Sequence, residues 1–206
     1  MLKLWGRINS VNVKKAYWAL EEVGVAYERV DAGGAFGLVK EEPFLSLNPN
    51  GVIPLLQDGG VALWESNAIV RYLSAQHGVG TLWAEDPAER AIGDKWMDWA
   101  TTTFAGPFRD VFWNLVRATP QERDQAAVER GHAACCALLP RLDAALARAP
   151  YLSGSTFRMG DIPLGCFAYL WFEMPIDRPH LPHLEDWYAR IRTRPAFQKA
   201  VATPLT

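Results

Sequence analysis

Apolar and polar positions follow two different periods in the first part of the chain. Residues 2–5 and 25–30 form short apolar runs that are typical of strands. Between them, apolar side chains recur at helical spacing up to Gly24, where the helix is expected to end. The pattern therefore predicts a strand, a helix and a second strand, followed by a glycine-rich loop over residues 31–37.

A hairpin and another helix are predicted next. Within residues 51–63, two apolar runs flank the turn at Asp58-Gly59, and such a turn joins antiparallel strands. Helical spacing resumes at Ser66. The order strand–helix–strand and then strand–strand–helix is typical of an α/β unit with a mixed sheet.

Helical periods alone occupy the rest of the chain, beyond the glycines at 78 and 80. The predicted helices cover residues 88–115, 122–147, 161–172, 184–192 and 195–201. We therefore expect an α/β domain over residues 1–78, a linker over residues 79–87 and an all-helical domain over residues 88–206.

Composition and charge narrow the class of protein. Half of the 206 residues are hydrophobic, and the formal net charge of −2 comes from intermixed acidic and basic residues. The chain has no basic block, so we expect neither nucleic acid nor a membrane as partner. No signal peptide or membrane-spanning stretch is predicted. The three cysteines and four histidines show no disulfide or metal spacing, which favours a reduced, cytoplasmic protein without a metal.

Polar residues open the first predicted helix. Ser10 and Asn12 follow the first strand directly. A helix start leaves backbone N–H groups unpaired and carries partial positive charge, so a thiolate placed there is stabilised by the field and by a hydroxyl donor. The alternative is that Ser10 or Asn12 merely caps the helix.

A proline opens the third predicted strand. If the Ile53-Pro54 bond is cis, Val52 presents its backbone N–H and C=O outward, where a peptide-like ligand can pair with them. The alternative is an ordinary trans proline at the start of a strand.

The third feature is a polar pair between the hairpin and the next helix. Ser66 is placed to cap that helix, and the helix N-terminus suits a carboxylate. Glu65 beside it can accept from a ligand ammonium, so the pair suits a group that carries both an α-amine and an α-carboxylate. The alternative is simple capping by Ser66 with Glu65 in solvent.

These three features occur in the order seen in one family. The segments LWGRINSVNVKKAYWALEEVGVAYE, NPNGVIPLL and WESNAIVRYL resemble the opening, the cis-proline segment and the γ-glutamyl signature of the cytosolic glutathione transferases. The likeness continues through STFRMGDIPLG and RIRTRPAFQKA, so it covers nearly the whole chain. The chain resembles a bacterial serine-type, theta- or nu-like member, with a thioredoxin-like N-terminal domain and an all-helical C-terminal domain.

The resemblance implies a role for each site residue. Ser10 is expected to be the thiol partner, with Asn12 as a second polar group. Val52, with the Ile53-Pro54 cis bond after it, is expected to hold the cysteinyl backbone of glutathione. Glu65 and Ser66 are expected to hold the γ-glutamyl group. Lys40 is a candidate for the glycyl carboxylate on position and charge.

The first long helical segment of the second domain is rich in aromatic residues. In the family this segment borders the pocket of the electrophilic substrate, so Phe108 and Trp113 are candidates for its wall. The alternative is that each lies in the core or in a subunit interface. The helical domain also departs from the family pattern, because Arg158 stands where a Ser or Thr usually precedes Asp161 in a capping box.

The function that follows is conjugation of glutathione, as co-substrate, to small electrophiles, as in detoxification, by a homodimer. One alternative is reduction of peroxides or glutathione-linked disulfides at the same site. Another is a non-catalytic binding or regulatory module with the same fold.

Overall fold

The computed structural model describes residues 1–206, and its contacts divide the chain into two compact units. The first unit comprises Met1–Glu85 together with Arg194–Thr203, and the second comprises Asp86–Thr193 together with Pro204–Thr206. None of the helices has both the length and the apolar character needed to cross a membrane.

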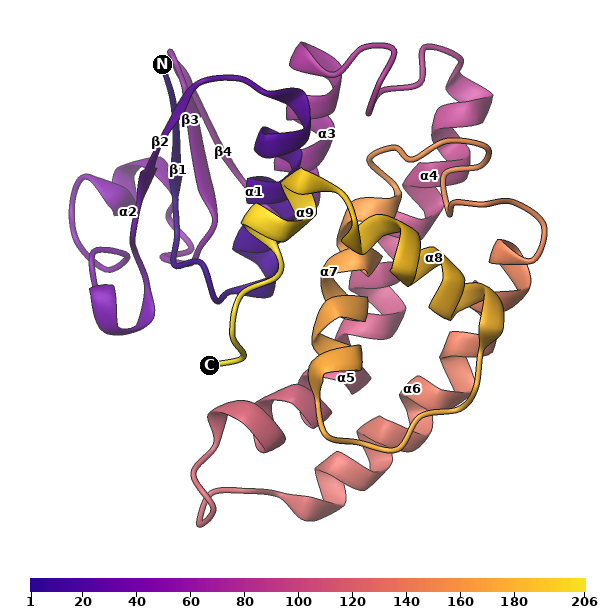
Figure 1. The fold of residues 1–206 in the computed structure, drawn as a ribbon. Helices are drawn as coiled ribbons and strands as arrows, with labels where there is room; N and C mark the ends of the chain where they lie inside the picture. Colours follow the sequence, from indigo (N-terminus) through magenta and orange to yellow (C-terminus); the bar gives the residue numbers. More distant parts are fainter. The chain divides into compact units, whose positions relative to one another are not determined.

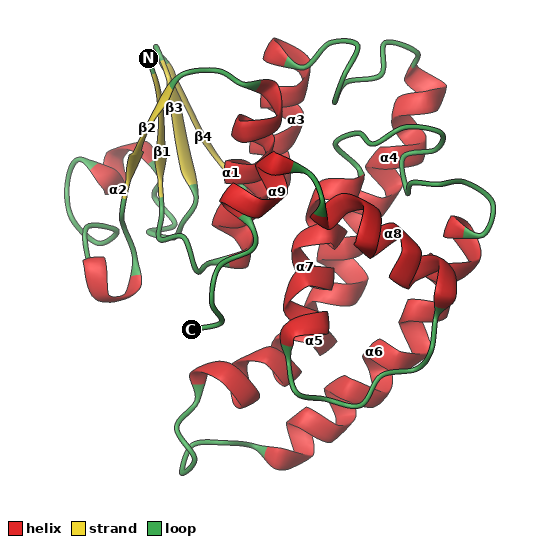
Figure 2. Cartoon of the chain, viewed as in Figure 1, coloured by secondary structure: helices red, strands yellow, loops and turns green.

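A mixed four-stranded sheet forms the centre of the first unit, in the order β2-β1-β3-β4 (Figures 1 and 2). β1 is parallel to β2 and antiparallel to β3, and β3 and β4 form the predicted hairpin. The second strand is shorter than predicted, and the third begins only after Pro54, which has no N–H to donate to the ladder. The strands are β1 (Leu2–Trp5), β2 (Tyr27–Val30), β3 (Leu55–Asp58) and β4 (Val61–Trp64).

Helices cover both faces of this sheet. α1 (Val11–Val23) and α3 (Ser66–His77) lie on one face, and the short α2 (Phe44–Leu47) lies on the other (Figure 1). α1 ends at Gly24, whose φ of 69° places it in the left-handed region that favours glycine. A 3-10 turn (Gly34–Phe36) follows β2 within the glycine-rich loop.

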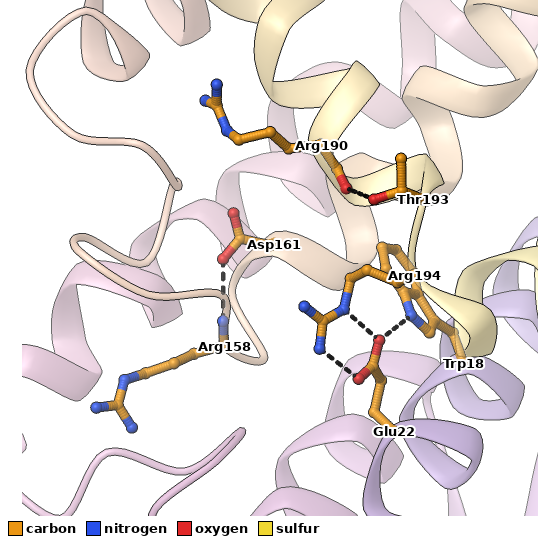
Figure 3. A network of polar contacts seen from close by, with 7 residues as sticks. All are labelled: Trp18, Glu22, Arg158, Asp161, Arg190, Thr193 and Arg194. Atoms are coloured by element: carbon orange, nitrogen blue, oxygen red, sulfur yellow. Dashed lines mark hydrogen bonds and ion pairs between the residues drawn. The ribbon is translucent and has the colours of Figure 1, made fainter.

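The C-terminal segment returns to the first unit. α9 (Pro195–Ala200) packs its Phe197 ring edge-on against Trp18 of α1, with ring centres 5.0 Å apart. Arg194 donates from two nitrogens to Glu22 at 2.6 and 2.7 Å, and Glu22 also accepts from the Trp18 indole at 2.8 Å (Figure 3). The contacts group Arg194–Thr203 with the first unit, although these residues lie within the range 88–206 for which the sequence pattern predicts the helical domain.

The second unit is entirely helical. Residues 87–117 form one nearly continuous helix in which two turns widen to π geometry, and α7 is buried on almost all sides, as expected for a helix that is apolar all round. The elements are α4 (Pro87–Trp99), a π turn (Ala100–Phe104), α5 (Ala105–Phe112), a π turn (Trp113–Arg117), α6 (Gln125–Leu146), α7 (Asp161–Glu173) and α8 (Pro182–Arg192).

Asp161 is the buried polar centre of the second unit. Its carboxylate accepts from the backbone N–H of Arg158 at 3.2 Å (Figure 3). It also accepts from the backbone N–H of Leu152 at 2.8 Å and from the Trp187 indole at 2.9 Å. The Arg158 guanidinium is directed to Glu89 instead, at 3.8 Å. The capping box therefore keeps the bond from the backbone of residue 158 to Asp161 and loses the reciprocal side-chain bond.

Candidate functional site at one edge of the sheet

All four strands meet the candidate site at the same edge of the sheet. Trp5 is paired with Val30 of β2 and with Leu55 of β3, and Leu55 is paired with Trp64 of β4. The chain leaves the sheet at this row after Trp5, Val30 and Trp64, and enters it there before Leu55. Every residue predicted to hold glutathione lies on one of the segments gathered at this edge, which are residues 6–12, 31–40, 52–54 and 65–67.

Ser10 precedes the first turn of α1 but does not cap it. Its backbone is extended, with φ −87° and ψ 124°, and its side chain makes no capping hydrogen bond. The capping alternative is therefore wrong for Ser10. Its partly exposed hydroxyl stands beside the unpaired N–H groups of a helix start, free to donate to a ligand.

Asn12 connects the first turns of α1 and α3. Its Oδ1 accepts from the ammonium of Lys15 at 2.9 Å and from the hydroxyl of Ser66 at 3.4 Å. Glu65, not Ser66, stands at the N-cap of α3, and the Ser66 hydroxyl is directed to Asn12 of α1. Two helix N-termini, each with partial positive charge, therefore lie next to each other.

Glu65 has an unusual backbone conformation, with φ 69° and ψ 111°. A residue other than glycine in such a region costs about 1–3 kcal/mol and persists only where its surroundings fix it. Its carbonyl accepts the first helical bond of α3, from Ile69 at 3.0 Å. The exposed carboxylate of Glu65 makes no bond within the chain, so it is available to a ligand cation at the start of α3.

The Ile53-Pro54 peptide bond is cis, as the resemblance implies. Val52 before it is 55% exposed, and its N–H makes no bond within the chain. Its carbonyl accepts from the amide of the buried Asn48 at 2.7 Å, which leaves one lone pair for a ligand. The side chain of Ile53 packs against Gly33, where a Cβ atom would come within 3.1 Å of it. This contact joins the cis-proline segment to the glycine-rich loop.

Lys40 lies directly over the backbone of Gly51. A Cβ atom at Gly51 would be 2.7 Å from the Lys40 ammonium and 2.9 Å from the carbonyl oxygen of Val39. The absence of a side chain at this position, which has φ 60°, therefore lets the ammonium approach the segment that contains Val52. Lys40 is exposed and pairs with no carboxylate of the chain.

Sequence reasoning missed three residues that shape this edge. Asn48 and Lys15 orient groups of the site, and each is nearly or fully buried. Arg7 packs over Gly34 and donates to Asn9 at 2.6 Å, while its Nε is buried without an acceptor. No local sequence signal distinguishes these three side chains from solvent-facing ones, and their contacts in the structure identify them.

The two predicted electrophile-pocket residues differ in exposure. Phe108 is 2% exposed and packs in the core of the second unit, between Phe104 and Phe112 and against Phe167. This packing favours the alternative that Phe108 is a core residue. Trp113 is 54% exposed, so its indole ring is accessible to a ligand.

The polar groups at this edge of the sheet indicate which kind of ligand it can bind. It presents a serine hydroxyl, free backbone groups, a free carboxylate and an unpaired ammonium, all beside two helix N-termini. The charges and free backbone groups of such a set are complementary to a peptide-like molecule with two carboxylates, an amine and a group that develops negative charge. No group of His, Cys, Asp and Glu side chains gathers where it could hold a metal ion.

Comparison with known proteins gives consistent matches over the whole chain. Models of the glutathione S-transferase N-terminal and C-terminal domains match residues 1–75 and 94–195. Glutathione S-transferase GstB from Escherichia coli is 46% identical over 208 residues and covers 100% of both chains. Glutathione S-transferase 3 from Zea mays is 37% identical over 210 residues, covering 98% of this chain and 93% of the relative.

A solved structure gives the same result. The theta class glutathione S-transferase from Xanthomonas axonopodis pv. citri, solved with glutathione bound, has a TM-score of 0.97 and 59% identity, covering 100% of this chain and 99% of that chain. The thioredoxin-like N-terminal unit and the helical C-terminal unit predicted from the sequence are thereby confirmed.

Proposed function

This chain belongs to the glutathione S-transferase family, and we propose that it performs the family's reaction by holding the glutathione sulfur as a thiolate at the N-terminus of α1. The observation that carries the proposal is the Ser10 side chain, which stands at the helix start without capping it. Asn12 adds a second polar group two residues further along the chain. The thiolate then attacks a small electrophile.

The two ends of glutathione are assigned to different segments of the edge. The γ-glutamyl carboxylate is placed at the start of α3, beside Ser66, and its ammonium at the carboxylate of Glu65. The cysteinyl backbone pairs with the N–H and the free carbonyl lone pair of Val52, as a short added strand. The glycyl carboxylate is placed at Lys40.

Ser10 and the N-terminus of α1 can supply the free energy needed to hold the glutathione thiol as a thiolate. A free thiol with a pKa of about 8.5 is only a few per cent ionised at neutral pH. Lowering that pKa by about two units requires about 2.7 kcal/mol of preferential thiolate stabilisation. One hydrogen bond to a charged group contributes about 1.5–3 kcal/mol, so Ser10 and the helix start together suffice. Ser10 acts as a donor and need not become a base.

The test compares Ser10→Ala with Ser10→Thr, which keeps a hydroxyl donor. We expect the alanine variant to raise the pKa of the bound thiol by about one unit, a tenfold change, and the threonine variant to stay close to the original protein. The measurements are the ultraviolet absorbance of the bound thiolate against pH and the pH–rate profile with chlorodinitrobenzene. An unchanged pKa in Ser10→Ala would exclude Ser10 as thiolate partner.

A thioether analogue provides the control for folding. S-methylglutathione has no ionisable thiol, so calorimetry should give the same affinity for the original protein and for Ser10→Ala. Failure of the original protein to bind glutathione at millimolar concentration would overturn the enzymatic assignment and favour a non-catalytic module. Peroxide-dependent oxidation of glutathione, assayed beside conjugation, separates the two chemistries of a poised thiolate.

Three further points are part of the proposal. Trp113 is placed in the wall of the electrophile pocket, on the basis of its exposed indole. A homodimer is proposed from family membership, and light scattering tests it. A cytoplasmic location is proposed because all three cysteines are free, which fits a reducing compartment.

A further inference from the structure

Two adjacent lysines of α1 are buried, and the proposed function uses neither of them. Lys14 is 1% exposed and Lys15 is 2% exposed. A buried ammonium is costly unless it donates to good acceptors. Lys14 donates to the carbonyl of Val201 at 2.7 Å and to the hydroxyl of Thr203. Lys15 donates instead to Asn12 in the first turn of the same helix, at 2.9 Å.

The contact with Lys15 fixes the orientation of the Asn12 amide. An ammonium has three N–H donors and no acceptor, so the atom that it contacts at 2.9 Å must be the amide oxygen. The hydroxyl of Ser66 lies at 3.4 Å from the same oxygen. The amide nitrogen of Asn12 therefore points away from both, and it makes no bond within the chain on this exposed side chain.

We propose that Lys15 is a positioning residue, which holds the Asn12 amide so that its two N–H donors face the glutathione sulfur. This inference rests on the proposed function, because the group that the amide serves is the bound thiolate. With Lys15 absent, only the longer contact from the Ser66 hydroxyl, at 3.4 Å, holds the amide oxygen, so the amide can turn over more readily and present its oxygen, which repels a thiolate. Lys15 itself stays buried and touches no substrate.

The neighbouring lysine supplies a matched control. Lys14→Met and Lys15→Met each remove one buried positive charge from the same helix and keep a side chain of similar length. We expect Lys15→Met to raise the pKa of the bound glutathione thiol by about one unit, which is tenfold less thiolate near neutral pH. Lys14→Met should leave that pKa within a few tenths of the original value.

A double-mutant cycle tests whether Lys15 acts through Asn12. Lys15→Met should shift the thiol pKa strongly when Asn12 is present and hardly at all in an Asn12→Ala background. In the ligand-free protein, the NMR resonance of the Asn12 side-chain amide should move in Lys15→Met and stay in place in Lys14→Met. This readout does not depend on glutathione.

Each other outcome overturns the inference in a different way. If Lys14→Met and Lys15→Met shift the pKa of the bound thiol equally, Lys15 has only a structural role and does not position Asn12. Equal shifts by Lys15→Met with and without Asn12 would mean that its charge acts directly on the sulfur. If the original protein binds glutathione with the thiol pKa of free glutathione, the proposed function itself fails, and the amide resonance still decides whether Lys15 orients Asn12.

Discussion

Removing the carboxylate of Asp161 should cost the second unit a large part of its stability. In Asp161→Ala, the N–H groups of Leu152, Arg158 and Trp187 lose the acceptor that they share. Asp161 is 0% exposed, so water cannot replace it. A buried donor left without a partner costs about 1–3 kcal/mol, and relief of the buried charge offsets part of the sum, so we expect a loss of about 4 kcal/mol.

A second aspartate isolates the effect of burial. Asp143 also accepts two backbone N–H groups, those of His183 and Leu184, each at 2.9 Å, but it is partly exposed. Water can reach the donors in Asp143→Ala, so a loss of about 1 kcal/mol is expected, as for an ordinary helix cap. Asp161→Asn keeps one amide oxygen as acceptor and should fall between the two.

Urea unfolding measures these losses. With a slope of about 2 kcal/mol/M, the midpoint for Asp161→Ala should fall by about 2 M and that for Asp143→Ala by about 0.5 M. Tryptophan fluorescence follows the transition directly, since Trp187 is one of the affected donors. Equal midpoints for the two alanine variants would refute the argument that burial sets the cost.

Three further results are expected. Arg194→Met should lower stability by about 2 kcal/mol in thermal unfolding, because it leaves the 9%-exposed carboxylate of Glu22 without a counter-charge, and Glu22→Gln should cost less. Gly51→Ala should raise the KM for glutathione by about tenfold with a smaller change in kcat, because a Cβ atom there displaces the ammonium of Lys40; an unchanged KM would remove Lys40 from the site. Burial raises the pKa of Cys135 to about 12, so a disulfide reagent at pH about 8 should leave this thiol unmodified until the protein is unfolded.

The sequence predicted the local elements of the fold well because each one has a local signal. The helix start near Ser10 and the helix after Glu65 lie where propensity and spacing predict them, and the hairpin turn, at Gly59-Gly60, lies within one residue of the predicted place. The sequence could not show whether the Ser10 hydroxyl caps the helix or is left for a ligand, since capping and ligand binding require the same residue type at the same position. Only the structure shows that the capping bond is absent.

The non-local parts of the site could not be read in this way. The register that aligns Trp5, Leu55 and Trp64 in one row depends on strand pairing far along the chain. The partner of Lys14 lies 187 residues away, and nothing near Lys15 in the sequence indicates that its ammonium is buried. Such contacts depend on tertiary packing, which has no short sequence signal.

The return of Arg194–Thr203 to the first unit has a consequence for synthesis. When residues 1–85 have left the ribosome, the surface of Trp18 and the ammonium of Lys14 still lack the segment that covers them. At 5–20 residues per second, adding the next hundred residues takes about 5–20 s. The first unit thus completes its packing only after nearly the whole chain has been translated, and a fragment ending at Glu85 is a precursor of that unit rather than the unit itself.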